Sequence, residues 1–264
     1  MCIRKLFAEN AVVQVDTGKK QNHMAQRRKK PVDEDFEMDL NPGQRLLTRL
    51  RFDLKCKNER QKLFVKLINS KDIVICAGPA GTGKTFVACA EALKLLASRN
   101  TTYKKIIIAK SVTVLEGEEI GFLKGTMQDK MEPFMISFMD NFHKLIGKEL
   151  SNALLAAEII EVLPLAYIRG RSIDNAIIIV DEAQNISLKN MRSTMTRLGE
   201  DSKMIIVGDT RQKDIKKNEV SSLEKVVEFF KDMEEFGIME FNREDIVRNP
   251  LIIKIEETFE DNGC

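Results

Sequence analysis

The chain has no tryptophan, and aromatic residues make up 6% of its 264 residues. Few side chains are therefore available for stacking on nucleic-acid bases. A large excess of charge is also absent, because 42 lysine and arginine residues nearly balance 40 aspartate and glutamate residues, for a formal net charge of +2. A strongly basic surface over the whole chain is excluded, although a local basic patch is not.

Long apolar runs and paired cysteines are missing as well. No run approaches the roughly 18 apolar residues of a membrane span, and no secretory signal is evident. The five cysteines are an odd number without C-x-x-C spacing, which argues against a disulfide framework and a zinc site. We therefore expect a soluble, cytoplasmic protein that does not bind membranes, with a sizeable core built from its 43% hydrophobic residues.

The first 41 residues differ from the rest in their charge pattern. Residues 19–30 carry six basic residues and no acidic one, whereas residues 33–39 carry five acidic residues. Blocks of one sign usually remain solvated, so we expect residues 1–41 to form a flexible, poorly ordered arm. Binding of nucleic acid by this arm is the alternative interpretation. Residues 42–264 are then expected to form a single globular domain.

Beyond the arm, short apolar runs alternate with amphipathic helical patterns. Strands are predicted over 73–77, 105–109, 159–163, 176–180, 204–207 and 238–241. Helices are predicted over 59–69, 86–97, 126–146, 188–198 and 221–233. This alternation favours an α/β fold, a mostly parallel sheet with helices on both faces. Ligands of such folds bind where the strands end at their carboxyl edge.

Residues 78–85 read GPAGTGKT, which fits the phosphate-binding pattern G-x-x-x-x-G-K-[ST] between a strand and a helix. Its glycines let the backbone close around an anion, and its N–H groups converge on phosphate oxygens. Lys84 would reach the β- and γ-phosphates of ATP, and Thr85 would bind Mg²⁺. A glycine-rich turn capping an ordinary helix is the alternative. The predicted phosphate-binding residues are Gly78, Ala80, Gly81, Thr82, Gly83, Lys84 and Thr85.

A second acidic motif follows the predicted strand 176–180, where residues 176–185 read AIIIVDEAQN. Asp181 is placed to hold the Mg²⁺ shell, and Glu182 to orient and deprotonate a water molecule. A small-molecule kinase does not need the second carboxylate, so the pair favours hydrolysis. Lys84 and Asp181 are 97 positions apart, which leaves room in the sequence for the strand 105–109. This spacing resembles the additional-strand class of P-loop ATPases, which includes RecA-like motors and helicases.

A third polar stretch, GDTRQ at 208–212, follows the predicted strand 204–207. If that strand neighbours the other two, the cluster lies beside the phosphates. Gln212 would then sense the γ-phosphate, as in helicase-like ATPases. A plain turn is the alternative, because glycine and aspartate favour turns.

Three arginines are candidates for contacting phosphate, namely Arg169 and Arg171 after a predicted strand and Arg248 late in the chain. Arginine commonly neutralises charge on a transferring phosphoryl group, often from a neighbouring subunit. A surface or salt-bridge role is the alternative for each of them.

Taken together, these motifs resemble the PhoH-like family of P-loop ATPases over roughly residues 58–259. The motifs are GPAGTGKT, EGEEIGFLKG at 116–125, PLAYIRGR at 164–171, VDEAQN at 180–185, GDTRQKD at 208–214 and DIVR at 245–248. The chain departs from the family's usual residues at Lys110-Ser111, Lys124 and Asn249.

The resemblance implies a RecA-like core of the superfamily-one helicase type, commonly assembled into a homo-oligomeric ring such as a hexamer. It makes Gln61 a candidate reader of adenine, and it makes Arg169, Arg171 and Arg248 candidate phosphate or intersubunit residues. Longer relatives carry a nuclease domain before this core. Only about sixty residues precede it here, too few for a domain of typical size. We therefore expect no built-in nuclease.

The expected function is Mg²⁺-dependent ATP hydrolysis coupled to RNA or single-stranded nucleic acid, with Glu182, Lys84, Gln212 and Arg248 as the catalytic residues. An ATP-dependent scaffold or regulator, whose nucleotide state controls oligomerisation or a protein partner, is the alternative. A P-loop kinase is a third interpretation. Stimulation of turnover by nucleic acid distinguishes a motor from a scaffold.

Overall fold

A computed structural model of the chain describes residues 42–110, 127–209 and 222–248, together with residues 251, 254, 255 and 258. Several features predicted from the sequence lie outside these residues. They are the charged arm over 1–41, Ser111, the EGEEIGFLKG block at 116–125 with Lys124, residues 210–214 of the GDTRQKD block with Gln212, and Asn249.

Six parallel strands in the described part of the chain form one sheet, in the order β3-β2-β4-β5-β1-β6. The strands are β1 (Ile73–Ala77), β2 (Lys105–Lys110), β3 (Ile160–Pro164), β4 (Ala176–Asp181), β5 (Lys203–Gly208) and β6 (Phe236–Glu240). All five residues of β1 and the first five of β4 are buried. Continuous apolar runs of this kind suit strands that are covered on both faces. The predicted parallel sheet is confirmed.

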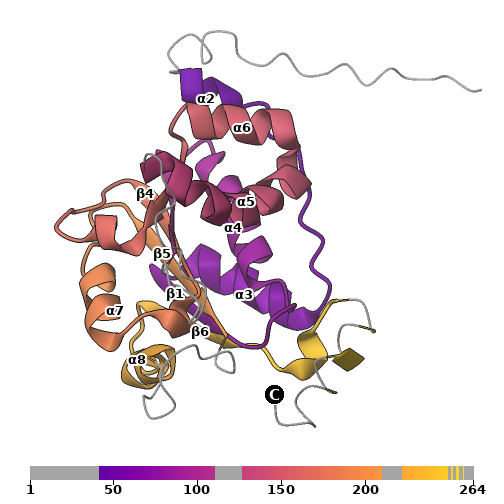
Figure 1. The fold of residues 1–264 in the computed structure, drawn as a ribbon, viewed down its shortest axis with the longest axis vertical. Coiled ribbons are helices and arrows are strands. Elements are labelled where there is room, and N and C mark those ends of the chain that lie inside the picture. The colour runs from indigo at the N-terminus through magenta and orange to yellow at the C-terminus, as the bar shows by residue number, and fades with distance from the viewer. Residues whose placement is uncertain are drawn as a thin grey trace, which may run out of the picture. The chain divides into compact units, whose positions relative to one another are not determined.

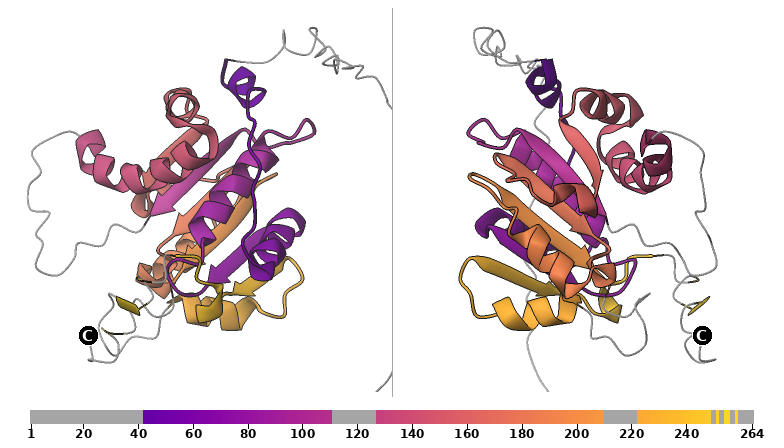
Figure 2. Two further views of the ribbon diagram at one scale, coloured as in Figure 1. Left: turned by 90° about the vertical axis from the view of Figure 1, so that its right-hand side faces the viewer. Right: turned by 60° about the vertical axis from the view of Figure 1, so that its left-hand side comes forward.

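Helices cover both faces of the sheet, which Figure 1 shows nearly edge-on and Figure 2 shows from two further directions. One face carries α3 (Glu59–Ser70), α4 (Lys84–Leu96), α5 (Met127–Ile146) and α6 (Lys148–Ala156). The opposite face carries α7 (Leu188–Met195), α8 (Ser222–Phe230) and the short turns η1 (Leu165–Ile168) and η2 (Ala183–Asn185).

Alternate residues of each strand enter two separate apolar cores. In β1, Val74 and Cys76 pack toward α3 and α4, whereas Ile73 and Ile75 pack toward the face of α7 and α8. This alternation follows from the period of two residues in a strand, whose successive side chains point to opposite faces. Apolar packing on both faces therefore fixes the carboxyl edge of the sheet, where β1 leads into GPAGTGKT and β4 ends at Asp181.

Most predicted elements agree with the structure to within three residues at each end. Among the α-helices of the described residues, two were not predicted, α6 and the six-residue α2 (Pro42–Leu47). Gly147 separates α5 from α6 with a φ of 81°, so the helical pattern that begins before it does not continue across it. Among the described helices, none combines the length and the apolar character needed to cross a membrane.

The order of the strands places the end of β5, where the polar stretch begins, between two other strands. β5 pairs with β1 on one side and with β4 on the other, so it lies between the strand before GPAGTGKT and the strand that ends in Asp181. β2 lies on the far side of β4. The GDTRQ stretch was expected beside the phosphates if its strand neighboured the strands that precede GPAGTGKT and Glu182. β5 neighbours both of these strands, β1 and β4.

Candidate functional site

The phosphate-binding loop connects β1 to α4 and is shaped by residues with positive φ. Gly81 has a φ of 82° and Gly83 a φ of 84°, a backbone region that residues with a Cβ rarely adopt. Gly83 caps α4 without a side-chain acceptor for the first-turn N–H groups. The N-terminus of α4 therefore points its N–H groups and its dipole at the place where an anion would lie.

Lys84, the first residue of α4, points back into the loop. Its Nζ donates to the carbonyl oxygens of Gly78 and Pro79, each at 2.8 Å, and the residue is 8% exposed. Burial lowers the pKa of Lys84 from its ordinary value. The loop thus encloses a lysine ammonium at its centre, where a phosphate could meet it.

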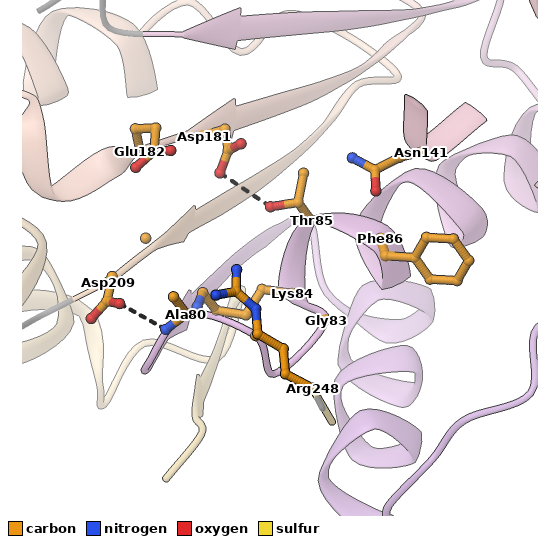
Figure 3. Close-up of a pocket in the computed structure, with 12 residues that line it drawn as sticks. Ala80, Gly83, Lys84, Thr85, Phe86, Asn141, Asp181, Glu182, Asp209 and Arg248 are labelled. Atoms are coloured by element: carbon orange, nitrogen blue, oxygen red, sulfur yellow. Dashed lines mark hydrogen bonds between the residues drawn. The ribbon is translucent and has the colours of Figure 1, made fainter. Parts of the chain in front are cut away.

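Asp181, at the end of β4, faces the first turn of α4. The hydroxyl Oγ1 of Thr85 donates to Asp181 Oδ1 at 3.2 Å, a contact drawn in Figure 3. Burial of the carboxylate, together with the neighbouring charge of Glu182, raises the pKa of Asp181 to about 6. A carboxylate in such surroundings is stabilised by a cation.

Glu182 lies one residue beyond the strand and has a strained backbone. Its φ of 52° and ψ of 41° fall in the left-handed region, which costs energy for a residue with a Cβ. Gln184 Nε2 donates to its Oε2 at 2.7 Å, and Lys110 Nζ lies 3.7 Å from its Oε1. Both oxygens of this carboxylate are therefore held from within the chain. Nothing in the sequence pattern of Glu182 indicated these two partners.

Asp209 joins the end of β5 to the phosphate-binding loop. Ala80 N donates to Asp209 Oδ2 at 2.7 Å, and Gly78 N donates to the carbonyl oxygen of Gly208 at 3.2 Å. Figure 3 shows Asp209 beside Ala80, on the far side of the loop from Thr85. The loop is thus fixed to β5 by contacts with two consecutive residues.

The segment after β6 docks on the same loop and brings Arg248 to it. Val247 N donates to the carbonyl oxygen of Gly81 at 3.0 Å. A Cβ added to Gly81 would lie 2.6–2.7 Å from atoms of the Arg248 side chain, so the arginine stem lies directly against the loop. The turn η3 (Arg243–Asp245) anchors this segment, because Asp245 pairs with Arg60 at 3.3 Å. Arg248 therefore reaches the phosphate-binding loop of its own chain.

Gln61 lies behind the loop, where both ends of its amide are engaged. Its Nε2 donates to the carbonyl oxygen of Thr82 at 2.8 Å, and its Oε1 accepts from Lys57 N at 2.7 Å. The residue is buried and does not line the cavity described next. In this arrangement Gln61 supports the loop, and its role as a reader of adenine stays a prediction.

A cavity of about 260 Å³ opens in front of the loop (Figure 3). The predicted site residues Ala80, Gly81, Gly83, Lys84, Thr85, Asp181, Glu182 and Arg248 line it. Phe86 and Asn141 also line it and were not predicted, since Asn141 belongs to α5 and no motif marks it. The two described arginines of the PLAYIRGR block are not among the lining residues, and Arg169 instead donates to Asn190 Oδ1.

The side chains at the cavity wall fit a hard divalent cation. Mg²⁺ prefers oxygen ligands, and proteins commonly supply one or two carboxylates beside the phosphates of a substrate. Thr85 Oγ1 and Asp181 Oδ1 are such oxygens, and they lie 3.2 Å apart at the mouth of the loop. Both predicted metal ligands are therefore brought together by the fold.

Comparisons with known proteins agree with the motif pattern. The family model described as PhoH-like protein matches residues 53–260. A PhoH-like protein from Bacillus subtilis (strain 168) is 39% identical over 207 residues, which span 78% of this chain and 64% of that protein. A PhoH-like protein from Synechocystis sp. is 37% identical over 246 residues, covering 93% of this chain and 70% of that protein.

Similarity to solved structures is more distant. The large terminase from a thermophilic bacteriophage matches 75% of this chain and 49% of its own, with a TM-score of 0.44 and 10% sequence identity.

Proposed function

Since this chain belongs to the PhoH-like protein family, we propose that it is an Mg²⁺-dependent ATPase. The observation that carries the proposal is the meeting of Lys84, Thr85, Asp181 and Glu182 at one cavity, from the ends of β1 and β4, which flank β5. A lysine in a glycine-rich loop together with two consecutive carboxylates is the set of groups that hydrolysis of a nucleoside triphosphate requires.

Each of these side chains has a distinct part in the proposed reaction. The N–H groups of the loop and the Lys84 ammonium bind the β- and γ-phosphates. Thr85 and Asp181 would hold Mg²⁺, which when bound neutralises charge on the phosphate oxygens. Glu182 orients the attacking water and accepts its proton as the water oxygen bonds to the γ-phosphorus. The bond between that phosphorus and the bridging oxygen then breaks, and ADP leaves.

Arg248 is proposed to stabilise the negative charge that develops on the transferring phosphoryl group. Support for this role comes from its position, because its side chain lies against Gly81 and lines the cavity. Arginine keeps its charge at all physiological pH values and can donate two parallel hydrogen bonds to phosphate oxygens. Gln212 is proposed to sense the γ-phosphate from the segment that follows Asp209.

We further propose that hydrolysis is coupled to RNA or single-stranded DNA, and that the ATPase domain of residues 42–264 assembles into a homo-oligomeric ring. Both parts are supported by the resemblance of the motif set to helicase-type cores. A nucleotide-dependent scaffold would share the hydrolytic site without responding to nucleic acid.

The proposal is tested by steady-state phosphate release from Mg-ATP, with and without single-stranded RNA or DNA, for the wild type, Lys84→Ala and Glu182→Gln. Hydrolysis in the wild type and none in either variant is the expected result, with turnover rising several-fold on addition of nucleic acid. Hydrolysis that ignores nucleic acid would favour the scaffold. Wild-type release no faster than that of the variants would contradict the ATPase proposal.

A further inference from the structure

Gln184 is a buried glutamine of η2 that connects Glu182 to the end of β5. The residue is 1% exposed and was given no role by the motif pattern. Its Nε2 donates to Glu182 Oε2 at 2.7 Å, and its Oε1 accepts from Asp209 N at 2.8 Å. A buried side-chain amide that uses both its donor and its acceptor ends has a fixed orientation.

The geometry assigns Gln184 as a positioning residue that holds the carboxylate of Glu182 in register with the phosphate-binding loop. This inference rests on the proposed ATPase function, because it concerns the step in which Glu182 acts as the base. It adds a residue that does not line the cavity and that would act on the reaction through Glu182.

The direction of each hydrogen bond follows from the chemistry of the partners. A backbone N–H can only donate, so the oxygen of the Gln184 amide must face Asp209 N. The NH₂ group then faces Glu182, whose ionised carboxylate can only accept. A glutamate at position 184 would keep the acceptor for Asp209 N but would place a second carboxylate against Glu182.

One further hydrogen bond extends this connection to the loop, and the lack of a side chain at Gly208 makes room for it. Asp209, which is 6% exposed, accepts from Ala80 N at 2.7 Å, so the connection runs from Glu182 through Gln184 and Asp209 to the loop. Gly208 leaves room for the amide, because a Cβ there would lie 2.8 Å from Gln184 Oε1. The base and the loop that binds the phosphates are therefore joined by three consecutive hydrogen bonds.

Glu182 needs external support to hold one orientation. Its backbone is in the left-handed region, and its side chain is 37% exposed at the cavity. A partly exposed carboxylate on such a residue could adopt several rotamers, and only some of them would direct an oxygen at an attacking water. Lys110, whose Nζ lies 3.7 Å from Oε1, holds the other oxygen more loosely. The shorter contact with Gln184 thus sets the orientation.

The experiment compares the wild type with Gln184→Ala, Gln184→Glu and Ser222→Ala. Ser222 is a matched control, because it is a buried polar residue whose hydroxyl donates to the carbonyl oxygens of Ala183 and Ile186 around the same turn. For each protein we would measure kcat for ATP hydrolysis, the dissociation constant of Mg-ADP and the midpoint of thermal unfolding.

We expect both Gln184 variants to lose on the order of 10²-fold in kcat, the loss typical of a misplaced catalytic group. Their affinity for Mg-ADP should stay within about twofold of the wild type, since the loss concerns the transition state. Ser222→Ala should keep its kcat even if it unfolds at a lower temperature.

Four results would overturn the inference. Gln184 variants that hydrolyse ATP at the wild-type rate would show that Glu182 needs no such support. Equal losses of kcat and of Mg-ADP affinity, or a similar loss of kcat in Ser222→Ala, would mark Gln184 as a general structural residue. A wild type no faster than Lys84→Ala would instead overturn the ATPase proposal itself, and the inference with it.

Discussion

Replacing Asp181 by asparagine is expected to stabilise the ligand-free protein while weakening its binding of Mg-nucleotide. Burial of the carboxylate, together with the charge of Glu182, raises the pKa of Asp181 from 3.8 to about 6 in the folded chain. The folded protein therefore binds this proton more tightly than the unfolded chain does. Asparagine keeps an oxygen that can accept from Thr85 Oγ1, but it carries no charge.

The sign and size of the effect follow from this difference in pKa. The contribution of Asp181 to stability is fully present below pH 3.8, where it is protonated in both states, and is lost as the pH rises through about 6. Each pKa unit corresponds to about 1.4 kcal/mol, so the loss reaches at most about 3 kcal/mol above pH 7. Asp181→Asn avoids that loss, and its advantage over the wild type should grow across the same interval.

The assay is urea unfolding at about pH 4.5, 6 and 8 in the presence of a metal chelator, with Asp232→Asn as a control for the change in net charge at an exposed site. The free energy of unfolding of Asp181→Asn should exceed that of the wild type by at most about 3 kcal/mol at about pH 8 and by much less at about pH 4.5. With saturating Mg-ADP the order should reverse, because a ligand stabilises the state that binds it.

Two outcomes would refute this reasoning. An advantage of Asp181→Asn that is equal at the lowest and the highest pH would mean that the carboxylate does not titrate differently in the two states. An asparagine variant less stable than the wild type at the highest pH without ligand would mean that a cation other than Mg²⁺ already compensates the buried charge.

Three further substitutions test the loop and the core. Gly81→Ala should weaken nucleotide binding at least about tenfold in a fluorescence titration. A φ of 82° costs a residue with a Cβ about 1–2 kcal/mol, and the added methyl group would also meet the Arg248 side chain. Gln61→Leu should lower the free energy of unfolding, measured in urea, by about 1–3 kcal/mol, because Lys57 N loses its acceptor. If stability is unchanged and the preference for ATP over GTP is lost, Gln61 would instead be a reader of adenine. Phe142→Ala should lower the free energy of unfolding by about 3–5 kcal/mol, because Phe142 is fully buried. Phe229 is 59% exposed, so Phe229→Ala should change that free energy by less than about 0.5 kcal/mol in the same assay.

The sheet could be predicted from the sequence because its strands are uninterrupted apolar runs. The range of β1 was predicted without error, and β4 and β5 were found within one residue at each end. The least accurate strand was β6, predicted over 238–241 and observed over Phe236–Glu240. Phe236 pairs with Ile73 of β1, so its inclusion depends on a neighbouring strand that is distant in the sequence.

The motif residues of the site could be predicted for a similar reason. GPAGTGKT and the Asp181-Glu182 pair are short runs of consecutive residues that follow strands, so the sequence was sufficient to predict that they lie together at one cavity. The contacts of Lys110 and Gln184 with Glu182 could not be predicted this way. Lys110 at the end of β2 reaches Glu182 because it lies opposite Asp181 on the adjacent strand β4. The contact of Lys110 depends on the order of the strands, which local patterns do not specify, and that of Gln184 depends on the turn of η2.

The order of the strands also separates the roles open to the three candidate arginines. Because β6 follows β1 at one edge, the segment after it returns over the phosphate-binding loop and brings Arg248 to the cavity of its own chain. β3 forms the opposite edge, and the exposed Arg169 and Arg171 follow it. The role proposed for Arg248 therefore needs no arginine from a neighbouring subunit, because its side chain lines the cavity of its own chain. Arg169 and Arg171 do not line that cavity, so a phosphate contact from either of them stays a prediction.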